Sequence, residues 1–151
     1  MSARKKRSRT SSSISSGSRT RRTIGRIVLG SFLAFAGISH LTFARKEFVA
    51  QVPEWVPLED DVVVVGSGVA EISLGAALVA LPSRRVPVGW LVAAFFVAIF
   101  PGNISQYVTR TSAFGLTTDR KRFVRLFFQP VLVLWALWST GAWKALRASR
   151  R

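Results

Sequence analysis

Four long apolar stretches alternate with polar, charged segments along the chain. They cover residues 24–43, 62–81, 86–104 and 123–143. Each is close to the roughly 20 residues that an α-helix, rising about 1.5 Å per residue, needs to cross a hydrocarbon core of about 30 Å. The pattern therefore predicts an all-α fold, a polytopic four-helix membrane domain over residues 24–143.

The segments outside this domain are basic tails. Residues 1–23 are rich in Ser, Thr and Arg without apolar periodicity, so we expect a disordered tail, and residues 144–151 form a second basic tail. Beside a membrane helix we expect the first tail to bind anionic lipid rather than nucleic acid. A secretory signal peptide cleaved at Ala34-Phe35-Ala36 is the alternative, but apolar character continues past this point.

Charge and composition fit a membrane protein. The chain of 151 residues is 49% hydrophobic yet has a formal net charge of +15. Fifteen of its 22 basic residues lie in the two tails, counting Arg26, and in the 82–85 turn, whereas the 44–61 loop holds five of the seven acids. The positive-inside rule then predicts a multi-pass protein of the bacterial cell membrane with both termini in the cytoplasm.

Absent residue types narrow the chemistry. The chain has no cysteine and one histidine, His40, which excludes thiolate metal sites, iron–sulfur clusters, cysteine nucleophiles and a bis-histidine haem within one copy. Walker, Ser-His-Asp and metal-ligand patterns are also missing. We therefore expect no catalytic or metal site, and no catalyst acting on its own.

Several polar residues fall inside the predicted helices, toward the ends that face the two long loops. An ionised group in hydrocarbon costs about 3 kcal/mol or more on insertion scales, so these groups should face the bundle interior. Glu71 could pair with Arg125, or donate as a neutral acid to His40 or Gln129. We interpret Arg125 as an ion-pair candidate, and as candidates for binding a ligand or a proton His40, Glu71, Asn103 and Gln129.

These residues also have structural interpretations. Glu71 and His40 could tie helices together. Asn103 follows Pro101-Gly102 and could cap a broken helix end. Gln129, beside a proline, could satisfy backbone groups that a kink frees.

Small residues recur at helical spacing in the first two apolar stretches. In the first stretch they predict a helix-packing seam of Gly30, Ala34 and Gly37. In the second, Gly68 and Gly75 flank the acidic residue at 71, where they permit close helix contact or leave room for a ligand.

The 44–61 loop contains Pro53-Glu54-Trp55-Val56-Pro57. Two prolines flanking a tryptophan suit an ordered turn at the level of the lipid headgroups. We interpret Pro53, Trp55 and Pro57 as a candidate docking loop for a partner protein.

Several short motifs occur in order over residues 26–140. They are Gly37-Ile38-Ser39-His40, Phe48, Val52-Pro53-Glu54-Trp55-Val56-Pro57, Ser67-Gly68-Val69-Ala70-Glu71, Phe100-Pro101-Gly102-Asn103-Ile104, and Gln129 with Trp135. In order and spacing they resemble the DoxX-like family of four-helix membrane proteins. The resemblance implies a left-handed bundle associated with membrane redox complexes, since the family is named after a subunit linked to thiosulfate:quinone oxidoreductase. The chain departs from a redox enzyme in lacking cysteine, and from the usual motif in having Gly102 where Ala is commoner.

Three functional hypotheses follow. The first is a non-catalytic subunit that binds a small hydrophobic or quinone-like ligand, with Glu71 holding or relaying a proton and His40 as its partner. The second is a structural or assembly subunit without a ligand. The third is a small proton-coupled transporter, which a chain this short would need to oligomerise to form. The expected partners are the lipid bilayer, other membrane or redox subunits, and further copies of the chain.

Overall fold

The computed structural model describes the backbone of residues 3–149 and the side chains of residues 17–148. This part of the chain is helical without strands, in the order α1 (Ala3–Leu41), α2 (Arg45–Val49), α3 (Asp60–Ala80), the 3-10 turn η1 (Pro82–Arg84), α4 (Arg85–Val108), α5 (Asp119–Thr140) and α6 (Ala142–Ser149). Four segments are long and apolar enough to cross a membrane, namely Gly17–Leu41, Asp60–Ala80, Pro82–Val108 and Asp119–Thr140. The predicted all-α architecture with four candidate spans is therefore confirmed.

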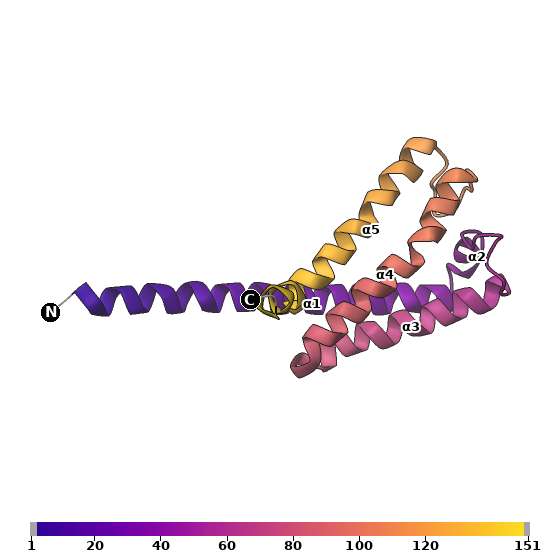
Figure 1. Cartoon of the computed structure of the whole chain (residues 1–151). Helices are drawn as coiled ribbons and strands as arrows, with labels where there is room; N and C mark the ends of the chain where they lie inside the picture. Colours follow the sequence, from indigo (N-terminus) through magenta and orange to yellow (C-terminus); the bar gives the residue numbers. More distant parts are fainter. Residues whose placement is uncertain (1–2, 150–151) are drawn as a thin grey trace.

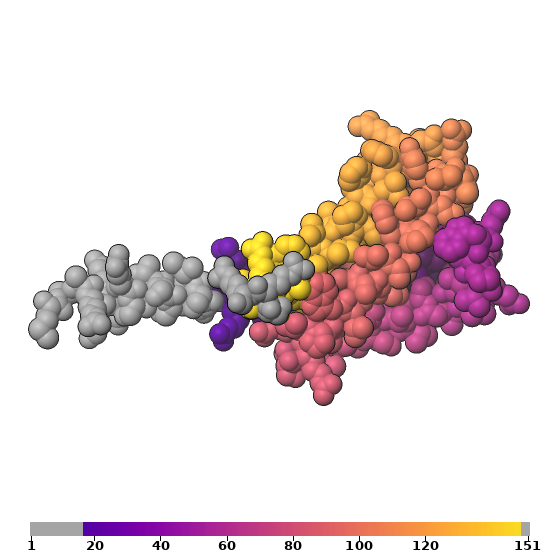
Figure 2. All heavy atoms as spheres, in the orientation of Figure 1, coloured from indigo at the N-terminus to yellow at the C-terminus, as the bar shows by residue number. Residues whose placement is uncertain are grey.

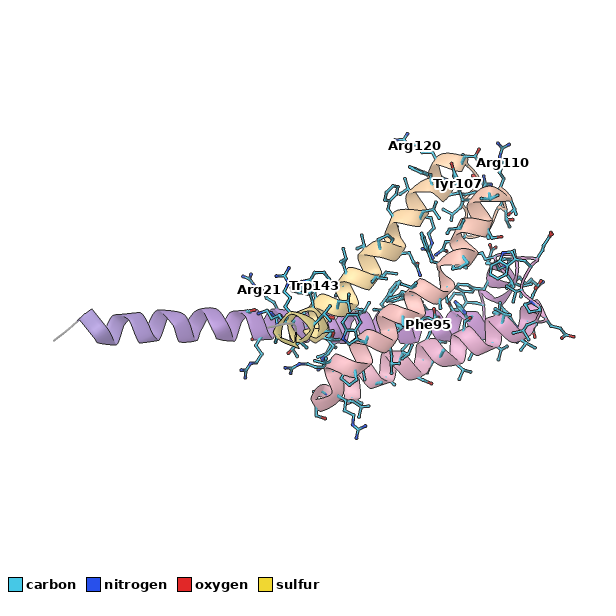
Figure 3. All side chains as sticks on the ribbon, in the orientation of Figure 1. Arg21, Phe95, Tyr107, Arg110, Arg120 and Trp143 are labelled. Carbon is cyan, nitrogen blue, oxygen red and sulfur yellow. The ribbon has the colours of Figure 1, made fainter. Side chains whose placement is uncertain are left out.

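The four long helices form two hairpins that meet as a wedge (Figure 1). α1 packs along α3, and α4 packs along α5. The hairpins meet near the chain ends, where the Trp135 indole N–H donates to the Gly25 carbonyl at 3.0 Å. They diverge toward the opposite end, where residues 42–59 stand in the angle (Figure 2). We call these ends the terminal end, marked by Arg21 and Trp143, and the loop end, marked by Tyr107, Arg110 and Arg120 (Figure 3).

The first hairpin is held by direct contact between backbones. A Cβ atom added to Gly30 would lie 2.8 Å from the Gly75 carbonyl oxygen, and one added to Gly37 would lie 2.5 Å from the Gly68 oxygen. Helices approach this closely only where both carry small residues. The predicted seam, with Ala34 between its two glycines, is confirmed, and the two glycines of α3 serve helix contact rather than leaving room for a ligand.

The apolar core occupies the terminal half of the wedge. It consists of Leu29, Leu33, Leu78, Val88, Val92, Ala93, Phe96, Ala136, Leu137 and Ala142. At its edge the buried Arg26 donates to the carbonyls of Leu78 and Val79, at the last turn of α3. A helix ends with carbonyls that lack intrahelical donors, and a cation is favourable there. Arg26 therefore joins α1 to the end of α3.

The first helix differs from its prediction at both ends. α1 begins at Ala3, so residues 3–23, which we expected to be disordered, are helical in the structure from that residue on. Extending an existing helix adds a hydrogen bond per residue without a new nucleus. Residues 1–2 and 150–151 of the predicted tails lie outside the described residues. α1 ends at Leu41 rather than at residue 43, which places His40 in its last turn.

The other helix ends also differ by one to four residues, and three of them have consequences for the site or the tail. α4 continues through Pro101 to Val108, so Asn103 does not cap a broken helix end. α5 begins at Asp119 because the hydroxyl of the preceding residue, Thr118, accepts from the backbone N–H of Lys121. It ends at Gly141, whose φ of 79° is the left-handed conformation that glycine adopts readily. The predicted C-terminal tail is thus largely the separate helix α6.

Candidate functional site

A cavity of about 520 Å³ lies between the two hairpins at the loop end. Its walls come from α1, α3, α4 and α5, and α2 with the segment after it covers the cavity. All but one of the predicted site residues line it: Pro53, Trp55, His40, Glu71, Asn103, Arg125 and Gln129. Pro57 is exposed outside the cavity. Polar residues spread over four apolar helices are thus brought together around one space.

His40 and Glu71 form a buried pair in the wall made by the first hairpin. The His40 Nε2 atom lies 3.4 Å from the Glu71 Oε2 atom, and the side chains are 8% and 6% exposed. The other ring nitrogen, Nδ1, lies 3.0 Å from the Ser67 hydroxyl oxygen, and that hydroxyl donates to the Val64 carbonyl at 2.9 Å. The close contact of Gly37 with α3 brings these side chains together.

One arrangement of hydrogens satisfies both contacts of the Ser67 hydroxyl. Ser67 uses its one hydroxyl hydrogen on the Val64 carbonyl, so its oxygen accepts from the N–H at Nδ1 of His40. In a neutral imidazole, Nε2 then carries no hydrogen and faces the carboxyl group. One further proton can lie between the two groups, on the carboxyl or on the ring. Glu71 Oε2 is buried and makes no hydrogen bond with the described residues.

Arg125 does not form the predicted ion pair with Glu71. The acid has His40 as its neighbour within 4.0 Å, and Arg125 makes no hydrogen bond or ion pair with the described residues. The reason is the arrangement of the helices: α3 packs against α1, whereas α5 stands across the cavity. Arg125 is half-buried in the opposite wall.

Asn103 and Gln129 are buried and connect the helices of the second hairpin. The Asn103 side-chain N–H donates to the Gln129 Oε1 atom at 3.0 Å, and the Gln129 Nε2 atom donates to the Phe96 carbonyl at 2.7 Å. Phe96 precedes Pro101 in α4, where proline lacks a backbone N–H and its ring crowds the preceding turn. We predicted that Gln129 satisfies backbone groups freed by a kink beside Pro130. It instead bonds the Phe96 carbonyl of α4, whereas the carbonyl that Pro101 leaves without a helical donor is that of Val97.

The sequence did not predict the cover over the cavity. Phe48 of α2 packs on His40 with 3.4 Å between ring centroids, and it meets Phe114 edge to face at 4.6 Å. The Glu47 carboxylate accepts from the backbone N–H of Phe114 at 2.6 Å, which joins the two loops of this end. α2 has five residues, too few for a helical period to show, and Phe48 was noted as part of a motif without a contact.

Other loop-end contacts anchor this cover. The Arg45 Nε atom donates to the Asp61 carboxylate at 2.7 Å, and this hydrogen bond raises the pKa of Arg45. The Gln51 side-chain N–H donates to the Gln106 Oε1 atom at 2.9 Å. Arg122 is buried and bonds both the Thr111 carbonyl and the Asp119 carboxylate.

Metal binding has no support in the described part of the chain. Within residues 17–148 no three His, Cys, Asp or Glu side chains gather to hold a metal ion.

Fold and site together define an all-α protein with four candidate membrane spans and a polar-lined cavity between two hairpins. Residues 29–140 match the family model described as "Domain of unknown function (DUF8561)", so the chain belongs to that family. The match includes each residue that lines the cavity. No curated protein and no solved structure matches the chain.

Proposed function

We propose that this protein is a non-catalytic membrane subunit that binds a small hydrophobic or quinone-like ligand in the cavity between its hairpins. The observation that carries this proposal is the Glu71 Oε2 atom, which is buried in the cavity wall and lies 3.4 Å from His40 Nε2, yet makes no hydrogen bond with that nitrogen or with any other described group. A buried oxygen without a partner is costly, and a ligand group would supply that partner. The volume of about 520 Å³ lies within the range of small-molecule sites, and most lining residues are apolar.

The chemistry of the acid pair supports a quinone-like group. The Glu71 carboxyl and the Nε2 atom of His40 lie 3.4 Å apart without a hydrogen bond between them, so a proton held by either group would be free to go to a ligand, and the unprotonated group could accept one. A quinone carbonyl would accept from the carboxyl O–H, and a quinol hydroxyl would donate to the carboxylate. The resemblance to the DoxX-like family adds a redox complex as the setting in which such a ligand would be met.

The orientation that we propose places both termini in the cytoplasm and the cavity on the outer side. It rests on the excess of lysine and arginine in the segments at the terminal end. Since the chain has no cysteine, a single introduced cysteine is the only site in the protein that a maleimide can label, and its labelling reports on which side of the membrane it lies. In intact cells a membrane-impermeant maleimide should label Leu58→Cys at the loop end and should not label the matched Ser83→Cys in η1. The reverse pattern would overturn the orientation.

Ligand binding can be tested with decylubiquinone and the purified protein in nanodiscs. Trp55 lines the cavity, so its fluorescence should be quenched in a saturable way, and Trp55→Phe should remove most of that signal. We expect Glu71→Leu to weaken binding roughly tenfold or more, because a hydrogen bond to a charged or acidic group contributes about 1.5–3 kcal/mol. Glu59→Gln is the matched control, since Glu59 is exposed and outside the cavity.

A structural or assembly subunit is the second candidate. It is favoured by Trp55, whose side chain is 70% exposed although Pro53 beside it is buried. Such a residue at the level of the headgroups suits contact with another membrane subunit. Native mass spectrometry of the complex in mild detergent separates the candidates. A stoichiometric partner lost in Trp55→Ala, with no saturable decylubiquinone binding, would replace the ligand proposal with this one.

A further inference from the structure

We infer that the cavity takes an anionic amphiphile, whose carboxylate or phosphate headgroup pairs with Arg125 and whose chain leaves sideways between α1 and α5. This inference rests on the proposed function and narrows the class of its ligand. Neutral molecules of similar length, the short-chain quinone included, would enter the same cavity without using Arg125 and would bind more weakly.

The first support is that Arg125 is a cation without a counter-charge. It is the one lysine or arginine in the described cavity wall, and it forms no hydrogen bond or ion pair with the described residues. A guanidinium offers five N–H donors and cannot lose its charge, so a half-buried one at membrane depth needs an acceptor.

Two other arginines at the loop end, unlike Arg125, have acidic partners within the chain. Arg45 is held by Asp61, and Arg122 is held by Asp119 together with two loop oxygens. The carboxyl group in the cavity already has His40 beside it, at 3.4 Å. Glu71, the one acid that lines the described cavity with Arg125, has His40 as its neighbour, and the loop-end acids Asp61 and Asp119 pair with other arginines, so an anion from outside the chain is the group that would complete the donors of Arg125.

The second support is the distribution of polarity along the cavity. On α5, Arg125 lies nearest the loop end, and Phe128 and Leu132 follow on the same face of the helix toward the middle of the span. On α1, His40 lies nearest the loop end, and Ala36 and Phe32 follow in the same direction. A molecule with a charged head and an apolar chain matches this order, with its head toward the loop end.

The third support is that the cavity reaches the surface that faces lipid. Phe32 and Phe128 line the cavity and yet are 51% and 57% exposed. They stand on α1 and α5, the helices that meet at the terminal end and diverge toward the loop end (Figure 1). An acyl chain lying between these two rings would continue directly into the bilayer, so that an amphiphile could enter from the membrane without crossing water.

The experiment compares three probes of equal chain length, dodecyl phosphate, dodecanoate and dodecanol, with the protein in nanodiscs of zwitterionic lipid. We expect both anions to bind about tenfold or more tightly than the alcohol, as charge-assisted hydrogen bonds require. Arg125→Gln should remove that difference and leave dodecanol binding unchanged, and Arg125→Lys should retain part of it. Arg120→Gln, on the same helix but exposed and outside the cavity, is the control.

The outcomes separate the inference from the proposed function. If the three probes bind equally, and Arg125→Gln or Arg125→Lys does not alter their binding, the inference that an anionic headgroup pairs with Arg125 is overturned. The proposal that the cavity binds a hydrophobic ligand would stand. No saturable binding of any probe or of decylubiquinone would overturn both. Native mass spectrometry then identifies the source of the anion: a phospholipid retained by the unaltered protein and lost from Arg125→Gln supports a membrane lipid, and its absence alongside tight dodecyl phosphate binding supports a free amphiphile.

Discussion

In the α1–α3 hairpin the two backbones touch at two levels, whereas near the loop end the α4–α5 hairpin is joined by amide side chains. The first contact uses Gly30 with Gly75 and, two turns further on, Gly37 with Gly68. The second hairpin has a comparable glycine contact at the terminal end, where a Cβ atom on Gly89 would meet the side chain of Thr140. Toward the loop end its helices are instead connected through Asn103 and Gln129.

This difference shows how one chain builds both a firm wall and a cavity. Paired glycines let α1 and α3 lie in contact along their length, so neither helix can rotate without a clash. In the other hairpin Pro101 and Pro130 remove backbone donors, and the helices are joined near the loop end by the side-chain amide of Gln129, which bonds Asn103 and the Phe96 carbonyl. The cavity lies between the hairpin whose backbones touch and the hairpin joined by side-chain amides.

The strongest test of the comparison is Gly37→Ala. Its new methyl group would lie 2.5 Å from the Gly68 carbonyl oxygen, so α1 and α3 must separate. We expect the free energy of unfolding to fall by about 3 kcal/mol, the upper part of the usual range for overpacking. Gly66→Ala in α3 is the control, because that position has open space around it and alanine favours a helix by about 1 kcal/mol.

Unfolding in mixed detergent, followed by circular dichroism, measures both variants. The comparison fails if Gly37→Ala and Gly66→Ala have the same stability, because the backbone contact would then contribute nothing to the first hairpin.

Gln129→Leu is expected to lower the free energy of unfolding by less than Gly37→Ala does. The change removes the bond to the Phe96 carbonyl and leaves the Asn103 side-chain N–H without its partner, and hydrogen bonds inside membrane proteins contribute about 1–2 kcal/mol. A double-mutant cycle with Asn103→Leu tests the connection, since the second change should cost less once the first is made. Additive losses would mean that the two amides act independently of each other.

The smallest of these effects is expected from Arg26→Leu, which removes the donors at the last turn of α3. We expect a loss of about 1 kcal/mol, because a helix-terminal cation typically contributes 0.3–1 kcal/mol and somewhat more when it is buried. Arg21→Leu is the matched control on the same helix, since Arg21 is exposed at the terminal end (Figure 3). Equal stability of the two variants in thermal unfolding would argue against this link within the first hairpin.

The sequence predicted the four long helices because apolar length and helical rise leave little choice in a membrane. Their ends were less predictable. Pro101 indicated a break, but Gln129 from a neighbouring helix bonds the α4 backbone beside it, and the helix continues. That support comes from a residue far along the chain, which no local pattern reveals.

The sequence predicted that the polar residues of the site lie at similar depths near one end of the helices. It did not determine which of them contact one another. Helical rise gave the depth of Glu71 and Arg125 and put both toward the loop end. Which partner each would find depends on helix neighbours and rotation, and these are determined by glycine contacts between α1 and α3. The result is that Glu71 lies beside His40, one of the partners that the sequence offered, and not beside Arg125. Phe48 reaches His40 through a helix of five residues, too short to be recognised beforehand.

Each hairpin is made from consecutive spans, and Pro82–Arg84 is the one covalent link between the two halves. The protein can therefore be regarded as a heterodimer whose subunits happen to share a polypeptide. The cavity is then a subunit interface, and a ligand that binds there would contribute to holding the halves together. Two fragments divided within Pro82–Arg84 and expressed together would reassemble in the membrane to an extent that depends on ligand, so that reassembly itself becomes a measure of binding.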